Sequence, residues 1–348
     1  MIKIRKLKPA DIRKIQEMVE YIQPGHSSSF VSEDYFTLFP LDLFHNLLPP
    51  NMRFLQECFV AAEDKNLLGL IGLVPDGQQK TRWKINRLIL DINAYEIGQQ
   101  LIDFVVNRYG GSGVETFITT IDEKYPEAIS LFKNACKFRS CSHIHIWEKD
   151  NLEINTDFKN IGLLREVKIS DASKLRELDA QTLFPQFRTS LIKNIADYKF
   201  GLKNKIFNQI KGFKIKRFVL DNPGINSIEG YVLIMSKDNK NFWADIILSL
   251  AYQDYYEDIL NYIIRYVKSQ NENAKLHVYS RKYYQSNKKL VEVLAKQNFK
   301  PSHSFQVLVK DYWKITPVTS EDKKSPIIIF PDITSPACNS LKMNKFGR

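Results

Sequence analysis

The chain has 348 residues, 44% of them hydrophobic, and a formal net charge of +11 at pH 7. This length suggests two or three domains, and 22 Phe with 16 Tyr can fill two sizeable cores. No run approaches the roughly 18 uninterrupted apolar residues of a membrane helix, and the charged start MIKIRKLKPADI does not resemble a signal peptide. Because the four cysteines are scattered, with no CxxC spacing, we expect a cytoplasmic protein without disulfides.

The first half of the chain alternates strand and helix patterns. A short strand is followed by a helix that starts at Pro9-Ala10-Asp11, and an irregular stretch at 23–54 then holds either a substrate loop or a loosely packed connection. The remaining predicted elements are strands at 58–62, 67–74 and 83–91, a helix at 95–109, a strand at 114–120, a helix at 126–135 and a strand at 142–148.

The second half predicts the same order of elements. They are a strand at 163–167, a helix from 170, strands at 217–220, 230–235 and 242–248, a helix at 255–268, a strand at 275–280, a helix at 287–297 and a strand at 304–309. A polar linker at 151–161 therefore separates domains at 1–150 and 162–315. The Pro/Ser/Lys-rich tail at 316–348 either extends freely or docks its apolar cluster at 327–330.

An internal repeat supports this division. Residues 114–150 align without a gap on 275–311, an offset of 161, and the alignment pairs Phe138 with Phe299. Residues 3–15 align on 163–175 at an offset of 160, which pairs Arg5 with Arg165 and Asp11 with Asp171. Two segments at opposite ends of each half give nearly the same offset, so the sequence predicts a duplicated unit of about 150 residues.

The positive charge is partly concentrated at 193–217, where eight Lys or Arg face one acid, Asp197. Tyr198, Phe200, Phe207 and Phe213 lie between the basic residues. Basic residues interleaved with aromatics can follow a phosphate backbone and stack bases. The alternative is a solvated helix and an edge strand whose aromatics belong to the core.

The order of elements, found twice, resembles the GCN5-related N-acetyltransferase (GNAT) superfamily. The resemblance rests on IRKLKPADI, EDKNLLGLIGL with Gly69 and AISLFKNACKF in the first half, and on LREVKISDASKL, IEGYVLI with Gly230 and LAKQNF in the second. It covers about 2–149 and 162–312. It implies an α+β/α/β fold of two GNAT-like domains in tandem, each a mixed, mostly antiparallel twisted sheet flanked by helices, and acyl transfer from acetyl-CoA or another acyl-CoA.

In this family two parallel strands splay apart to hold the pantetheine arm, and a helix N-terminus receives the pyrophosphate. By resemblance, the cofactor-binding residues of the first copy are Leu88, Ile89 and Leu90, followed by Ile97, Gly98, Gln99 and Gln100. Glu96 would repel a pyrophosphate there, and Gly98 is equally compatible with ordinary close packing. The second copy has Tyr256 in the place of Gly98, so we expect it to be structural.

Catalytic residues are less well specified. Asp91, Tyr125 and Asp245 are weak candidates for acid or base, with Glu63 also near the expected cleft. Phe132 stands where family members often carry a tyrosine, and Lys137 replaces the usual glycine before Phe138. His143 and His145 share one strand face but have no third ligand in view, so no metal site is predicted.

Three functions remain open. The first is an acyl-CoA-dependent N-acyltransferase that transfers acetyl to an amine, on a small molecule or a protein, with acceptor specificity in 23–54 and 186–215. The second is a non-catalytic GNAT-fold binding or scaffold protein. The third is a nucleic-acid-binding protein that uses 193–217.

Overall fold

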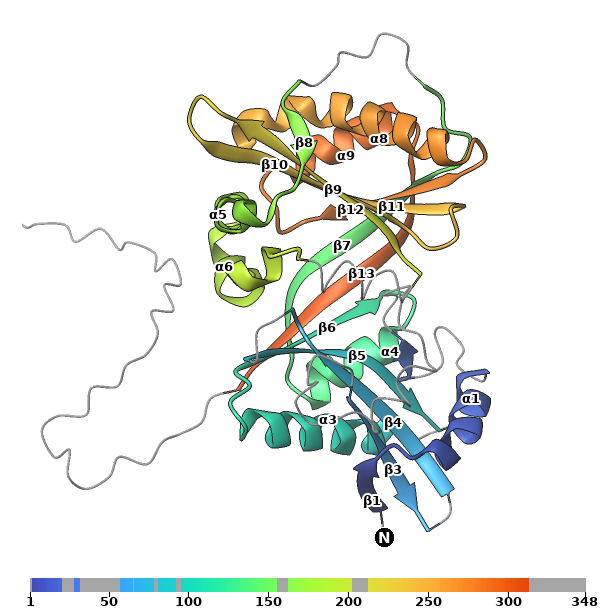
Figure 1. Ribbon diagram of the computed structural model, residues 1–348. Coiled ribbons are helices and arrows are strands. Elements are labelled where there is room, and N and C mark those ends of the chain that lie inside the picture. The colour runs from blue at the N-terminus through green and yellow to red at the C-terminus, as the bar shows by residue number, and fades with distance from the viewer. Residues whose placement is uncertain are drawn as a thin grey trace, which may run out of the picture. The chain divides into compact units, whose positions relative to one another are not determined.

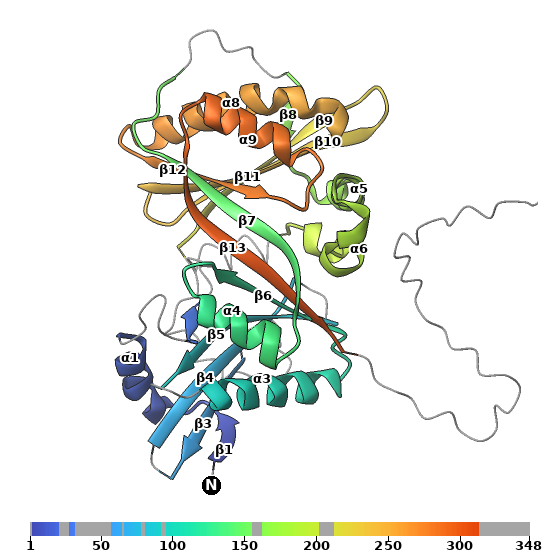
Figure 2. The same ribbon diagram turned by 180° about the vertical axis from the view of Figure 1, so that it is seen from behind.

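The computed structural model describes residues 2–20, 28–31, 57–64, 66–77, 81–91, 95–154, 162–201 and 212–312. Met1–Trp313 form one compact unit. In its described part the strands make a single 13-stranded mixed sheet that runs through both halves of the chain (Figures 1 and 2). None of the described helices combines the length and hydropathy needed to cross a bilayer. The predicted tail at 316–348 lies outside the described residues.

The elements of the first half follow the predicted order. They are β1 (Ile2–Lys6), η1 (Pro9–Asp11), α1 (Ile12–Glu20), β2 (Phe30–Val31), β3 (Glu57–Glu63), β4 (Asn66–Pro75), β5 (Arg82–Leu90), α3 (Tyr95–Gly110), β6 (Thr116–Asp122), α4 (Pro126–Ser130), the π-helical η3 (Leu131–Ala135) and β7 (Arg139–Lys149). The two-residue strand β2 is the one element that the sequence did not predict among these.

The second half repeats the series, and two short helices after α5 are described in it. Its elements are β8 (Leu164–Glu166), η4 (Ile169–Asp171), α5 (Ala172–Thr182), α6 (Pro185–Leu191), η5 (Ile195–Tyr198), β9 (Lys214–Asn222), β10 (Ser227–Ser236), β11 (Asn241–Leu248), η6 (Leu250–Tyr255), α8 (Tyr256–Gln270), β12 (Lys275–Arg281), α9 (Asn287–Lys296) and β13 (Lys300–Asp311). Helices α6 and η5 fall in the region that the sequence assigned to acceptor specificity.

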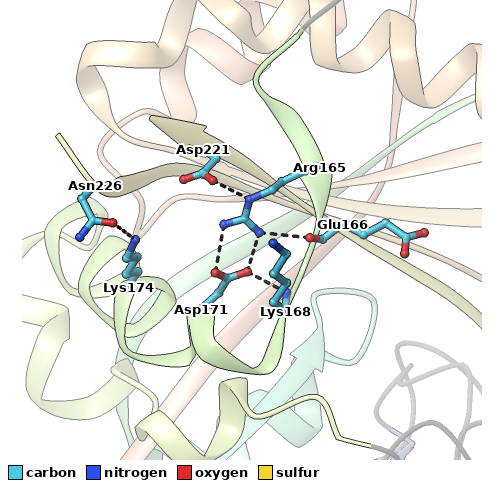
Figure 3. Close-up of polar contacts among 7 residues, drawn as sticks. All are labelled: Arg165, Glu166, Lys168, Asp171, Lys174, Asp221 and Asn226. Carbon is cyan, nitrogen blue, oxygen red and sulfur yellow. Dashed lines mark hydrogen bonds and ion pairs between the residues drawn. The ribbon is translucent and has the colours of Figure 1, made fainter. Parts of the chain in front are cut away.

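The paired arginines and aspartates of the repeat form the same network in both halves. Arg165 donates to both carboxylate oxygens of Asp171, at 2.8 and 3.0 Å, and the backbone N–H of Lys168 donates to the same carboxylate at 2.7 Å (Figure 3). Arg5 donates to Asp11 at 2.6 and 2.8 Å in the same arrangement. In each half this network fixes the first strand to the start of the first helix.

Two further positions repeat for steric reasons. A Cβ at Gly69 would lie 2.9 Å from the Leu90 side chain, and one at Gly230 would lie 2.4 Å from Leu248, so both strands need glycine to pack closely. After the last helix of each half the backbone turns through a positive φ, at Lys137 (59°) and Asn298 (60°). The departure noted at Lys137 therefore keeps the backbone conformation for which glycine is the usual residue.

The last strand of each half completes the sheet of the other half. β13 pairs antiparallel with β6 of the first half, and β7 pairs antiparallel with β12 of the second. β7 and β13 also pair with each other, so they lie side by side at the centre of the sheet (Figures 1 and 2). The two repeats have thus exchanged their final strands, and neither half of the sheet is complete without the other.

Helices cover both faces of the sheet in each half. In the first half the large buried cluster under α3 and α4 includes Phe59, Leu101 and Phe132, and α1 covers the opposite face through Ile15. In the second half α8 and α9 bury a cluster that includes Ile263 and Leu294, while α5 covers the other face through Leu175. Each half thus has its own two cores, as the aromatic and aliphatic content of the sequence allowed.

Candidate functional site

Two parallel strands diverge in each half of the sheet. β5 pairs with β6 only from Arg82 to Ile85, and β11 pairs with β12 only from Asn241 to Asp245. Beyond these residues β5 and β11 continue without a β6 or β12 partner. The divergence creates the wedge in which the family resemblance places the acyl arm.

In the first half the chain itself occupies the edge of β5 that faces this wedge. Leu88 pairs with Ile71 of β4 on one edge and with Phe30 of β2 on the other. The N–H of Leu90 donates to the Ser29 hydroxyl at 2.8 Å. The edge expected to hold a pantetheine arm at Leu88, Ile89 and Leu90 therefore already bonds an extended segment, residues 29–31, called the strap below.

The helix that follows β5 packs too closely for its glycine to be a simple phosphate cradle. A Cβ at Gly98 would lie 2.7 Å from the Leu131 side chain and 2.8 Å from that of Leu90. Ile97 is buried with Gly98, while Gln99 is half-buried and Gln100 is exposed. Gly98 therefore serves close packing, and the N–H groups of the first turn, with Gln99 and Gln100, are the groups left to meet a phosphate.

In the second half a tyrosine fills the corresponding space. Tyr256 is 1% exposed, and its hydroxyl lies 2.8 Å from the Ser286 hydroxyl, which donates to the Leu248 carbonyl at 2.8 Å. Burial raises the pKa of Tyr256 to about 12. The first turn of α8 also carries Glu257 and Asp258, which oppose a bound pyrophosphate. The start of α8 therefore has a buried tyrosine and two acids where the resemblance places the pyrophosphate.

The three catalytic candidates do not form one group. Asp91 is exposed at the end of β5, and Tyr125 precedes α4 with the Lys124 ammonium 5.2 Å from its ring centre. Asp245 lies in the second half, where it forms an ion pair with Arg281. Glu63 is exposed at the end of β3.

The histidine pair lies on β7, and the basic stretch is described at 193–201 and 212–217. His143 lies 3.4 Å from Glu123, and burial lowers the pKa of His145. The described ranges contain no group of three or more His, Cys, Asp or Glu that could hold a metal. In the basic stretch Tyr198 and Phe213 are buried, and Phe200 stacks on Tyr231 at 6.3 Å; Phe207 lies outside the described residues.

Sequence reasoning missed a polar cavity of ≈ 380 Å³, called the C-terminal cavity below. It opens beside α5, η5 and the central strands of the second half, and the turn after β4 of the first half contributes to its wall. Its charged lining residues are Asp76, Asp179, Lys193, Asp197, Arg217 and Asp245. Asp245 drew attention in the sequence, and Lys193, Asp197 and Arg217 belong to the basic stretch at 193–217, but no sequence motif joins these segments to Asp179 and Asp76.

No protein-family model and no curated protein matches the sequence. Solved structures do match. The "Tandem GNAT protein from the clavulanic acid biosynthesis pathway" is 12% identical over 91% of this chain and 100% of its own, with a TM-score of 0.58. A GCN5-related N-acetyltransferase from Sphaerobacter thermophilus is 10% identical over 90% and 96%, with a TM-score of 0.57. One from Anabaena variabilis is 12% identical over 90% and 73%, with a TM-score of 0.50. This chain therefore has the fold of two GNAT domains in tandem.

Proposed function

We propose that this protein is an acyl-CoA-dependent N-acyltransferase whose first half binds the donor and whose second half has lost that role. The observation that carries the proposal is the strap. Residues 29–31 occupy the edge of β5 that faces away from β4, by strand pairing at Leu88 and through the Ser29 hydroxyl at Leu90, so this edge has the hydrogen-bonding groups that an extended pantetheine arm needs. Acyl-CoA would supply an activated thioester at the wedge between β5 and β6.

The strap and a donor arm exclude one another, because both need the same edge of β5. Donor binding in the first half therefore requires residues 29–31 to leave β5. The pyrophosphate would bind the N–H groups in the first turn of α3 and the side chains of Gln99 and Gln100. The negative charge of Glu96 in the same turn would weaken this binding. An amine acceptor, on a small molecule or a protein, completes the proposed reaction.

The second candidate function is a non-catalytic GNAT-fold binding protein. Two observations favour it: the strap closes the cleft of the first half, and Tyr256 fills that of the second. Phe132 adds to this, since a wholly buried phenylalanine, packed edge-on against Phe30 and Phe138, cannot protonate a thiolate.

Isothermal titration with acetyl-CoA and with free CoA distinguishes the two candidates. We expect binding at one site per chain, about fivefold tighter in Ser29→Ala, which removes the strap's hydrogen bond to Leu90. Gln99→Glu with Gln100→Glu should weaken binding by adding negative charge beside the phosphate. Asp258→Asn, at the start of α8, is the matched control and should change nothing.

No heat from either the wild-type protein or Ser29→Ala, both shown to be folded, would favour the non-catalytic candidate. Gly98→Trp is a poor test, because its side chain would collide with Leu90 and Leu131 and disturb the core.

A further inference from the structure

Some carboxylates that line the C-terminal cavity form ion pairs with arginines, and others do not. Asp245 pairs with Arg281, and Asp76 accepts from Arg82 at 2.6 Å. These two acids have internal counter-ions, so they require no ligand.

Asp179 on α5 differs from them. Asp179 is only 3% exposed, and its carboxylate accepts hydrogen bonds from the hydroxyls of Tyr284, at 2.8 Å, and Tyr198. Within the described part of the chain no Lys, Arg or His lies within ion-pair distance of it. A buried carboxylate without a counter-ion favours a cation at the open side of the cavity.

Arg217 on β9 is a cation without a matching anion. Its guanidinium lies 4.2 Å from the centre of the Phe200 ring, and its buried Nε has no hydrogen-bond acceptor. It forms no ion pair with any residue that the structure describes. The guanidinium also hydrogen-bonds the Tyr231 hydroxyl, but burial raises the pKa of Tyr231 to about 12, so this neutral partner does not supply the missing anion. The flat donor fork of an arginine suits a carboxylate.

Asp179 and Arg217 line the same cavity but do not pair with each other. We infer that a small zwitterion of the α-amino-acid class binds between them, with its ammonium group at Asp179 and its carboxylate at Arg217. The cavity volume of ≈ 380 Å³ lies at the lower end of small-molecule sites, which run from roughly 300 to 1,000 Å³. This site is in the other half from the proposed donor cleft and does not depend on it.

The first half completes the wall of this site. Gly77 has a φ of +77°, and a Cβ there would lie 2.3 Å from a carboxylate oxygen of Asp197. Arg82 in the same hairpin donates to the carbonyls of Ser190 at 3.1 Å and Ile192 at 2.8 Å, which holds the end of α6. A ligand in the cavity therefore contacts a wall built from both repeats.

The test is a thermal-shift screen of the full-length protein against the proteinogenic L-amino acids, followed by isothermal titration of the best one. Its decarboxylated amine and its deaminated acid serve as one-charge analogues. We expect the amino acid to raise Tm and both analogues to fail. Arg217→Gln and Asp179→Asn should each weaken binding about tenfold or more. Exposed Arg265→Gln and Asp254→Asn should bind as the wild-type protein does.

The proposal is overturned if no amino acid stabilises the folded wild-type protein, if an analogue binds equally well, or if both cavity variants retain affinity. Asp179→Asn keeps an oxygen for the Tyr284 hydroxyl, so it should fold. If Arg217→Gln does not fold, Arg217→Lys provides the second variant, which keeps the charge but loses the donor fork. A third variant, Gly77→Ala, should weaken binding by displacing the turn that closes the cavity.

Discussion

The two halves of the molecule agree where the chain enters each sheet and differ where a ligand would lie. Arg5 with Asp11, and Arg165 with Asp171, form matching pairs of hydrogen bonds 160 residues apart in sequence. At the cleft, by contrast, the first half has Gly98 and a strap along β5, whereas the second has Tyr256 and a charged cavity beside α5.

This contrast separates the residues that build the fold from those that bind ligands. The arginine–aspartate networks, the glycines that face Leu90 and Leu248, and the positive-φ turns at Lys137 and Asn298 are needed by any copy of the framework. The cleft residues carry no such constraint, so the two copies diverge there. Because the last strands are exchanged, the copies cannot separate even though their sites differ.

The largest expected effect concerns this exchange. Cutting the chain between residues 155 and 160 should leave two fragments that stay together, because β13 pairs with β6 and β7 pairs with β12. Size-exclusion chromatography of the nicked protein measures this directly. Elution as two separate folded fragments would mean that each half closes its own sheet.

The second prediction compares the two cleft positions. Gly98→Ala should destabilise the protein by about 1–3 kcal/mol, since its Cβ has no room beside Leu131 and Leu90. Tyr256→Phe loses only hydrogen bonds at Ser286 and should cost about 1 kcal/mol. Urea unfolding of both variants gives the comparison. If Gly98→Ala left the stability unchanged, α3 would have room for a Cβ at this position, and the glycine could instead serve phosphate binding.

The repeated networks differ in one respect, which gives the third prediction. Arg165 also binds Asp221, at 2.5 Å, so Arg165→Met leaves two carboxylates without their partner, whereas Arg5→Met leaves only Asp11. We expect Arg165→Met to lower the free energy of unfolding by about 2 kcal/mol and Arg5→Met by about 1 kcal/mol. These values are smaller than for a fully buried ion pair, because both arginines are partly exposed. Equal losses in denaturant unfolding would show that Asp221 adds nothing.

The same networks have a defined pH dependence. Hydrogen bonds from Arg5 hold the pKa of Asp11 below its usual 3.8; at Asp171 burial acts to raise the pKa, but Arg165 and the Lys168 N–H lower it overall. Both contributions are therefore complete above about pH 4 and disappear as the acids are protonated below it. The differences between the methionine variants and the wild-type protein should shrink in acid.

The smallest expected effect lies at the junction of the halves. Burial, assisted by Lys275, lowers the pKa of His277 to about 4, and its ring stacks on Trp243 at 4.0 Å. The unfolded chain takes up a proton near pH 6.5 that the folded chain excludes, so stability falls as pH drops from 6.5 toward 4. His277→Phe should remove about 1 kcal/mol of the stability difference between pH 7.5 and 5.5. An unchanged pH profile in chemical denaturation would contradict this.

Much of the framework was predictable because its signals are local. The paired Arg5 and Arg165, the strand and helix periods and the glycines at 69 and 230 all lie within short segments. The strand exchange was not predictable, because β7 and β13 have matching apolar positions such as Ile146 and Val307. By its sequence pattern, either strand could pair with β6 or with β12. Only the three-dimensional pairing distinguishes them.

The site was predictable only in part. The sequence picked out Leu88–Leu90, which lie at the end of β5, and Ile97–Gln100, which lie in the first turns of α3, and it noted Tyr256 in the place of Gly98. It could not reveal that Ser29 and Phe30 return to β5, since a two-residue strand has no periodicity. The C-terminal cavity brings together Asp179 and Arg217, which are far apart in the chain, and of the two only Arg217 lies in a segment that the sequence marked, the basic stretch at 193–217.

The most direct test of the contrast between the halves is hydrogen–deuterium exchange of the full-length protein with and without acetyl-CoA. With acetyl-CoA we expect slower exchange at 95–101, faster exchange at 28–31 as the strap leaves β5, and no change at 246–260. Protection at 246–260 instead, with 28–31 unchanged, would place the donor site in the second half and contradict the assignment of roles.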